Sequence, residues 1–291
     1  MGTNSLIYQY KTANIITKLI VINGIIFILI NLVSFFFQIS PESLTQWVSL
    51  PDNVGDVILQ PWSFFTYAFL HFGFFHILFN MLWLHWFGKY ILNLFSEKRF
   101  LAIYLLGGLF GGLLYIIAYN TLPVFENHPP TALIGASGAV MAIIAFIATH
   151  TPNTSLRFFA WNIKLWQIAV FLFLFDLIRL PASENEGGLL AHIGGTLFGY
   201  VYARQLAKGN DIGKWFENIM DWFANLFKSR SKRPLKKVHK TKKANWDRTK
   251  TNPSEGDHQK KVDAILDKIG KSGYDSLTKA EKDFLFRAGK D

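Results

Sequence analysis

The chain contains no cysteine among its 291 residues. Disulfide bonds, thiol catalysis and cysteine-ligated metal sites are therefore excluded, although this absence does not fix the redox compartment. Two hydrolase signatures are missing as well. There is no H-E-x-x-H zinc-protease motif, and the segment GASGA at 135–139 lacks the last glycine of a G-x-S-x-G nucleophile elbow.

Charged residues are also absent from several long stretches, and apolar residues fill them. The chain is 51% hydrophobic and has 28 Phe. Apolar stretches of about 20 residues are typical of membrane-spanning helices. The sequence predicts an all-α membrane protein with six spans, at Ile15–Phe37, Phe72–Leu94, Phe100–Tyr119, Ala132–Ala148, Leu165–Leu180 and Leu189–Ala207. The first run is too long for a signal-peptide core, so we expect no cleavable signal.

The charges in the loops predict the orientation of these spans. Basic residues precede the first span and lie in the second and fourth loops, as at Lys98, Arg99 and Arg157. The first loop has three acidic residues and no Lys or Arg, and the third loop has only Glu126. Basic loops stay on the cytoplasmic side. We therefore expect a multi-pass protein of the cytoplasmic (inner) membrane with both termini in the cytoplasm.

Composition divides the chain into four regions. A short cytoplasmic N-terminus at 1–14 precedes the six-span core at 15–207, an amphipathic helix and basic linker at 208–257, and a small helical module at 258–291. Up to Ala203 the chain has 8 basic and 8 acidic residues, whereas the remainder has 22 basic and 12 acidic residues. The net charge of +10 therefore belongs to the predicted cytoplasmic tail.

The residues that follow the predicted spans indicate contact with lipid. Trp215, Ile219, Trp222 and Leu226 share one face of a predicted interfacial helix. The basic segment at 230–243 suits anionic headgroups, and no nucleic-acid-binding motif accompanies it.

The last region predicts two short helices that could dock an unidentified cytoplasmic partner. Gly270 is expected to end the first helix, and Thr278 with Glu281 forms a predicted capping box for the second.

Polar residues inside the predicted spans are candidates for function. His76 and Asn80 are four residues apart and share a helix face in the second span. In the sixth span, His192 shares a face with Gly195 and Gly199, and such small residues let a neighbouring helix approach closely. Ser137 begins a predicted helix whose face also carries small residues. An imidazole and a hydroxyl could therefore come within hydrogen-bonding reach, as a base and its nucleophile. A lone span histidine or a G-x-x-x-G pattern is also common in ordinary helix packing.

Asp176 is the only carboxylate well inside a predicted span. A two-aspartate protease would need a second one, so that class is set aside. Arg179 lies three residues further on, and we expect these two side chains to pair.

Three motifs together resemble the rhomboid family of intramembrane serine proteases. They are H-x-x-x-x-H-x-x-x-N at 71–80, G-x-S-G at 135–138 and A-H-x-x-G-x-x-x-G at 191–199, and the resemblance covers about residues 15–207. It implies a six-helix rhomboid-like bundle that cleaves other membrane proteins near the outer leaflet, without metal or cofactor.

The resemblance also implies residue roles. Ser137 matches the nucleophile and His192 the general base, and no acidic third member is evident, so we expect a dyad. His76 and Asn80, with the Ser137 backbone N–H, match the oxyanion-binding groups. Supporting positions are His71, Gly135, Gly138, Gly195 and Gly199.

The chain departs from the family pattern at two positions. It has Trp62-Ser63 where many members have Trp-Arg, and Met141 where many have an aromatic residue that packs on the catalytic histidine. These differences concern the anchoring of the first loop and the orientation of the histidine.

Two other functions fit the same residues. A non-catalytic rhomboid-like protein would bind membrane clients and tolerate the loss of Ser137. A haem- or metal-binding protein could use His71, His76 and His192, and the purified protein would then be coloured or contain metal.

Overall fold

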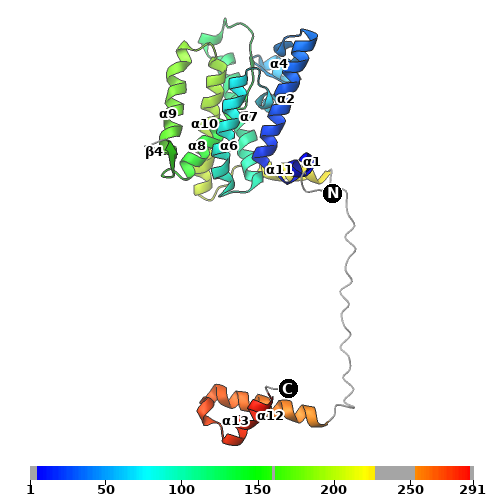
Figure 1. Cartoon of the computed structure of the whole chain (residues 1–291). Helices are drawn as coiled ribbons and strands as arrows, with labels where there is room; N and C mark the ends of the chain where they lie inside the picture. Colours follow the sequence, from blue (N-terminus) through cyan, green and yellow to red (C-terminus); the bar gives the residue numbers. More distant parts are fainter. Residues whose placement is uncertain (1–4, 159–160, 227–252, 289–291) are drawn as a thin grey trace. The chain divides into compact units, whose positions relative to one another are not determined.

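The structure is a computed structural model that describes residues 5–158, 161–226 and 253–288. It is mostly helical and divides into two compact units, Met1–Ser229 and Arg230–Asp291. The helices of the first unit are α1 (Leu6–Thr12), α2 (Ile15–Phe37), α3 (Pro41–Thr45), α4 (Val54–Leu59), α5 (Ser63–Thr66), η1 (Tyr67–Phe69), α6 (Phe74–Leu92), α7 (Glu97–Thr121), η2 (Pro123–Phe125), α8 (Ser137–His150), α9 (Leu165–Arg179), η3 (Leu180–Ala182), α10 (Glu186–Ala207) and α11 (Lys214–Leu226) (Figure 1).

Several of these helices can cross a membrane. Among the described residues, α2, α7 and the continuous segment Leu165–Ala182 are long and apolar enough. A fourth span results if Ser63–Phe69 and α6, which meet at a bend of 100°, count as one. The membrane character predicted from the sequence is thus confirmed, whereas the count of six spans remains a prediction.

The fourth apolar segment does not begin as a helix. The sequence predicted a span from Ala132, but α8 starts at Ser137. Ala132 and Leu133 instead form strand β2, which pairs antiparallel with β1 (Leu50–Pro51). This pairing provides partners for backbone N–H and C=O groups that would otherwise have bonded within a helix. The start predicted for this span was therefore wrong by five residues.

Helix α8 is the centre of the first unit. Each of its residues from Gly138 to Ala148 is buried, and α6, α7, α9 and α10 pack around it. The approach of α10 is very close, because a Cβ atom at Gly195 would lie 2.0 Å from the Gly138 carbonyl oxygen. A Cβ atom at Gly199 would lie 2.2 Å from the Ala142 carbonyl oxygen. The small residues of α10 therefore allow the close packing that the sequence predicted.

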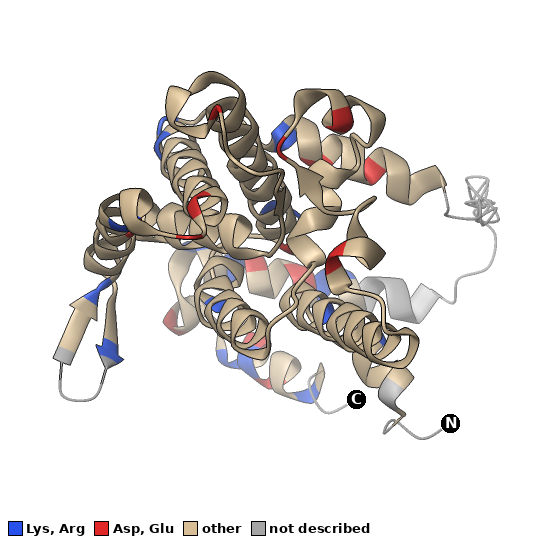
Figure 2. Cartoon of the chain, turned by 90° about the horizontal axis from the view of Figure 1, so that it is seen from above, with Lys and Arg blue, Asp and Glu red and all other residues tan. Residues whose placement is uncertain are grey.

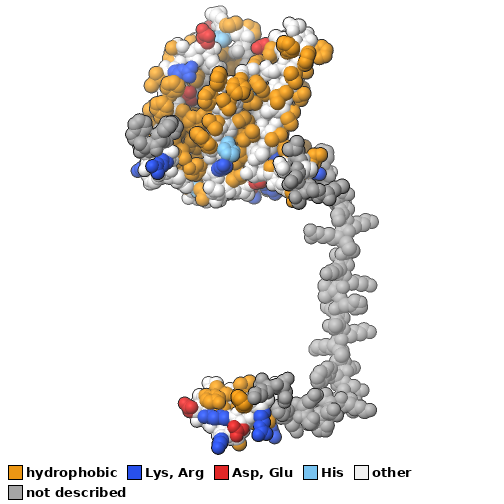
Figure 3. Space-filling view, in the orientation of Figure 1, with side chains coloured by type: hydrophobic (Ala, Val, Ile, Leu, Met, Phe, Trp, Pro, Cys, Tyr) orange, Lys and Arg blue, Asp and Glu red, His pale blue; other side chains and the backbone are white. Residues whose placement is uncertain are grey.

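The flank of the bundle is apolar. Hydrophobic side chains cover much of it in Figure 3, and most of the ribbon in Figure 2 is uncharged. In α9 only Leu165 and Asp176 are buried, while residues such as Phe171 and Ile178 are exposed. An exposed apolar helix surface of this kind suits contact with lipid.

The loops contain structure that periodicity did not predict. The first loop folds into α3, β1, α4 and α5. The fourth loop contains an antiparallel hairpin of β3 (Ser155–Phe158) and β4 (Trp161–Lys164), beside α9 (Figure 1).

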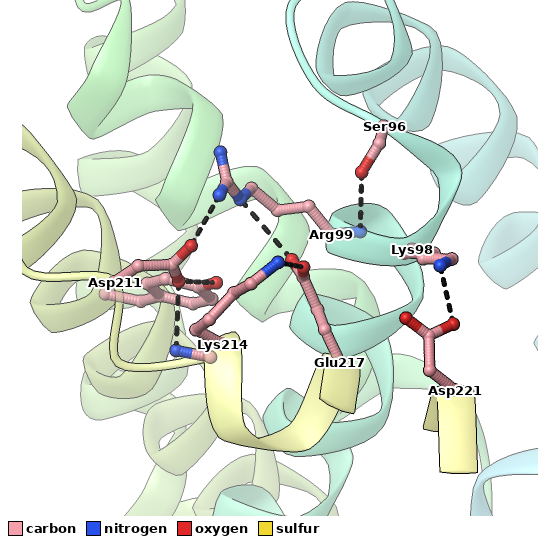
Figure 4. A network of polar contacts seen from close by, with 9 residues as sticks. Ser96, Lys98, Arg99, Asp211, Lys214, Glu217 and Asp221 are labelled. Atoms are coloured by element: carbon pink, nitrogen blue, oxygen red, sulfur yellow. Dashed lines mark hydrogen bonds and ion pairs between the residues drawn. The ribbon is translucent and has the colours of Figure 1, made fainter. Parts of the chain in front are cut away.

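Helix α11 is attached to the first unit by ion pairs. Arg99, in the first turn of α7, contacts Asp211 and Glu217, and Lys98 contacts Asp221 (Figure 4). Burial alone would raise the pKa of the Asp211 carboxyl, but the Tyr202 hydroxyl and the Arg99 guanidinium together hold that pKa below its usual value. The face of α11 that carries Glu217 is thereby held against the bundle. The predicted apolar face is exposed, at Trp215, Ile219, Trp222 and Leu226, and so is Phe223.

The second unit consists of α12 (Pro253–Ser272), η4 (Tyr274–Ser276) and α13 (Lys279–Ala288), with Ile265 and Leu277 buried. The predicted stop at Gly270 is wrong, since α12 continues to Ser272 and the residue with positive φ is Gly273, at 76°. Glycine adopts this left-handed conformation readily and commonly follows a helix end. The capping box of Thr278 and Glu281 is confirmed by reciprocal backbone hydrogen bonds. The basic segment at 230–243 lies outside the described residues.

Candidate active site

Ser137 is the first residue of α8, and the loop before it is held by backbone hydrogen bonds. The Gly135 N–H donates to the Tyr67 carbonyl at 2.9 Å, and the Ala136 N–H donates to Nε2 of His71 at 3.3 Å. These bonds fix the place at which the helix starts. The first N–H groups of a helix have no partner within it, so the Ser137 N–H is free to bind an acceptor from outside the helix.

His71, which precedes α6 in the chain, supports this loop. Its side chain is fully buried, and its ring packs edge to face against the His76 ring, with centroids 4.8 Å apart. His71 therefore positions both the Ala136 amide and the His76 ring, and it does not line the cavity described below.

His76 and Asn80 lie on one face of α6, as their spacing predicted. The Asn80 side-chain amide donates to the His76 carbonyl at 2.9 Å, and Asn80 is only 7% exposed. A carboxamide nitrogen has two hydrogens, so one remains for another acceptor.

His192 lies on α10, and its partner was not predicted. Nδ1 of His192 is 3.1 Å from Oδ2 of Asp176, on α9. Asp176 and Arg179, both among the described residues, do not form the expected ion pair. The Arg179 guanidinium instead lies over the Phe175 ring, 5.3 Å from its centre. The prediction of that pair was wrong, and so was the expectation that no acidic group accompanies the histidine.

One cavity of about 690 Å³ brings the candidate groups together. It is lined by His76, Asn80, Ser137, Met141, Asp176 and His192, among others. The Ser137 hydroxyl and the His192 ring make no direct hydrogen bond in this arrangement of the described residues. Such bonds are often long before substrate binds, so shared access to one cavity is the relevant geometry.

The two departures from the family pattern have visible environments. Met141 is 7% exposed and lines the cavity. Trp62 anchors the first loop through its indole N–H, which donates to the Trp47 carbonyl at 2.7 Å, while Ser63 is fully buried. The loop thus has an anchor that does not require arginine.

No three His, Asp or Glu side chains within the described ranges are arranged so that they could hold a metal ion.

Comparison with known proteins gives two family matches. Residues 59–209, about half of the chain, match the model of the Rhomboid domain. Residues 249–289 match a family of unknown function, DUF6576.

Individual relatives agree with the first match. The chain is 30% identical to RHOMBOID-like protein 12, mitochondrial, of Arabidopsis thaliana over 50% of the chain and 46% of that protein. It is 27% identical to the presenilin-associated rhomboid-like protein, mitochondrial, of Mus musculus over 64% of the chain and 47% of that protein. It is 25% identical to rhomboid protease GlpG of Pectobacterium atrosepticum over 67% of the chain and 63% of that protein. The chain thus spans about half the length of the first two relatives.

Proposed function

The chain belongs to the rhomboid family, and from this premise we propose that it is an intramembrane serine endopeptidase that cleaves transmembrane segments of other membrane proteins. The observation that supports this most is the cavity shared by Ser137, His192, His76 and Asn80. A hydroxyl, an imidazole and two further polar side chains in one cavity of an apolar bundle form a constellation suited to acyl transfer.

In the proposed reaction, Ser137 Oγ attacks a peptide carbonyl carbon while its proton passes to Nε2 of neutral His192. The electron pair of the carbonyl π bond moves to the oxygen. When the tetrahedral intermediate collapses, the C–N bond breaks and the leaving amine takes the proton from His192. Water then hydrolyses the acyl-enzyme with the same base, so the mechanism uses no metal ion or cofactor.

Three donors are available for the oxyanion in this proposal. They are the His76 ring, the free hydrogen of the Asn80 amide and the Ser137 backbone N–H at the start of α8. The positive end of the α8 dipole adds to their effect. Donors that are already oriented stabilise the developing charge most strongly where water is excluded.

The substrate must expose its carbonyls before it reacts. A helix in lipid hides them in its own hydrogen bonds, so we expect cleavage at segments that unwind easily. The cavity is also lined by His128 and Glu184, from the loops on the side predicted to face outward, and by Glu186, the first residue of α10. This supports a cavity that opens toward the outer side of the inner membrane, with both termini in the cytoplasm.

The tail is proposed to bind the membrane surface. The ion pairs hold α11 on the bundle while its Trp and other apolar side chains remain exposed, which suits an interfacial helix. The basic segment would add attraction to anionic headgroups. We propose the second unit as a docking module for a cytoplasmic partner.

The test is incubation of purified full-length protein with a panel of single-span membrane substrates, beside Ser137→Ala. We expect cleavage by the wild type alone, together with labelling of Ser137 by an activated phosphonate. Binding of the same substrates by both proteins without cleavage or labelling would favour the client-binding alternative.

A further inference from the structure

Asp176 places a carboxylate where the burial of a charge is energetically unfavourable. It lies near the C-terminal end of α9, where the preceding residues from Leu165 to Phe175 include no charged side chain. Its side chain is only 8% exposed, although most of α9 presents apolar groups outward. A carboxylate buried within a membrane helix is strongly unfavourable without a partner, so its partner indicates its role.

That partner is His192. Arg179, one turn away on the same helix, would be the simplest counter-ion, but it stacks on Phe175 instead. The Asp176 carboxylate extends across to α10 and meets Nδ1 of His192 at 3.1 Å. Both side chains line the cavity that contains Ser137.

The contact fixes the chemistry of the ring. A carboxylate accepts hydrogen bonds, so Nδ1 is the protonated nitrogen and Nε2 keeps its lone pair. Only this tautomer lets Nε2 accept the proton of Ser137. When the ring becomes an imidazolium, the adjacent carboxylate stabilises its charge in a site of low dielectric constant. Met141, which lines the same cavity, has no strong hydrogen-bonding group that could fix the tautomer.

We propose that Asp176 is the positioning residue for His192 and in this way supports the Ser137–His192 dyad. This inference rests on the proposed function. The carboxylate does not take the proton. It holds the ring in one orientation and one tautomer, and it stabilises the imidazolium that forms during catalysis.

The experiment compares full-length wild type with Asp176→Asn, Asp176→Glu and the control Glu126→Gln. Glu126 is an exposed carboxylate that does not line the cavity, so the control loses the same charge elsewhere. For each protein in proteoliposomes, kcat, KM, the pH profile of kcat/KM and the melting temperature are measured on one cleaved substrate.

Asp176→Asn is expected to lower kcat by about ten-fold to 10⁴-fold, the upper figure being the loss in a soluble serine protease whose aspartate is replaced by asparagine. KM should change less than about two-fold, because no substrate contact is lost. The pH profile should differ from that of the wild type, since the imidazolium loses its carboxylate. Asp176→Glu should recover part of kcat, and Glu126→Gln should match the wild type.

The remaining ionisable side chains of the cavity are the same in all of these proteins. They are His76, Tyr115, Tyr119, His128, Arg179, Glu184, Glu186 and His192, so a difference between two profiles isolates Asp176. A wild-type profile in Asp176→Asn would overturn the inference. So would a loss of kcat that follows the melting temperature and leaves the pH profile unmoved, because that indicates a structural residue.

A second readout separates this inference from the proposed function. Nitrogen NMR of labelled His192 reports which ring nitrogen is protonated, without any turnover. We expect the Nδ1–H tautomer in the wild type and a mixture or the other tautomer in Asp176→Asn. The same spectrum in both proteins would overturn the positioning role. Failure of the wild type to cleave, with the tautomer shifted as expected, would overturn the protease proposal alone.

Discussion

A Cβ atom at Gly135 would lie 2.7 Å from Nε2 of His76. Gly135 also has a φ of +111°, which side chains rarely adopt. Gly135→Ala must therefore displace His76 or distort the loop that leads to Ser137. If His76 stabilises the oxyanion, we expect cleavage to fall by about a hundred-fold or more. Backbone strain should cost about 1–3 kcal/mol of stability as well.

Gly24→Ala is the matched control for this prediction. Gly24 lies within α2, and nothing is within 4 Å of the Cβ atom that the substitution adds. Cleavage should be unchanged and the melting temperature equal or slightly higher, since alanine favours a helix. If Gly135→Ala cleaved substrate as fast as the wild type, this result would contradict the proposed role of His76 in stabilising the oxyanion.

The packing of α8 against α10 gives a second prediction. Alanine at Gly195 or Gly199 would bring Cβ to about 2 Å from backbone carbonyl oxygens of α8, which cannot move aside as a side chain would. Each substitution should cost at least about 1–3 kcal/mol through overpacking. Thermal melting in detergent measures this, with Gly24→Ala again as the control. Melting equal to the control would show that the two helices separate without cost.

The fold was predictable where apolar length decides it. The bounds of α2 agree with its predicted span because the stretch from Ile15 to Phe37 is largely apolar and contains only one charged residue, Lys18. The start of α8 was not predictable, because Ala132 and Leu133 are as apolar as the helix that follows. Their partners in β1 are about 80 residues away, so no local pattern indicates the pairing.

The sequence predicted some, but not all, of the side chains that come together at the candidate site. Helical spacing placed His76 with Asn80, and the glycines of α10 indicated the approach that brings His192 toward Ser137. The contact of Asp176 with His192 was missed because Arg179 offered a partner one turn away. The available signal was a single carboxylate in an otherwise apolar helix, and the direction in which it points depends on tertiary packing.

The oxyanion groups give a third prediction. Asn80→Ala should slow cleavage by about a hundred- to a thousand-fold, while Ser137 should still react with an activated phosphonate, though more slowly. Asn31→Ala is the matched control, because the Asn31 amide makes the same 2.9 Å bond to the carbonyl four residues earlier, at Phe27, and lies outside the cavity. Melting should be similar in the two variants. A loss of activity in Asn80→Ala that merely follows its melting temperature would indicate a structural asparagine.

The attachment of α11 gives a fourth prediction. Arg99→Met leaves the carboxylates of Asp211 and Glu217 without this partner, and the Glu217 side chain is only 6% exposed. Breaking a fully buried pair costs about 3–5 kcal/mol, and the cost should be smaller here because the Arg99 side chain is 24% exposed. Hydrogen exchange of residues 214–226 should accelerate.

The control for Arg99 is Lys98→Met. Lys98 and Asp221 form an ion pair whose side chains are 58% and 45% exposed, and such pairs contribute about 0–1 kcal/mol. Exchange in α11 should therefore change little in this variant. Equal acceleration in both variants would show that the buried position of Glu217 does not matter.

The ionised carboxylate of Glu281 should stabilise the start of α13 in the second unit. The Thr278 N–H, the Lys268 ammonium and the Thr278 hydroxyl all bond the Glu281 carboxylate and lower its pKa to about 2. An unfolded chain would have this pKa near 4.5. A lowered pKa contributes stability that is complete above the unfolded value and is lost as the pH falls through the folded one.

A peptide of residues 249–291 should therefore retain the start of α13 at pH 5 and lose it progressively between about pH 4.5 and 2, as followed by carbon chemical shifts of residues 278–282. Glu281→Gln should remove this pH dependence at that helix start, whereas a transition of unchanged size in Glu281→Gln would assign it to another carboxylate.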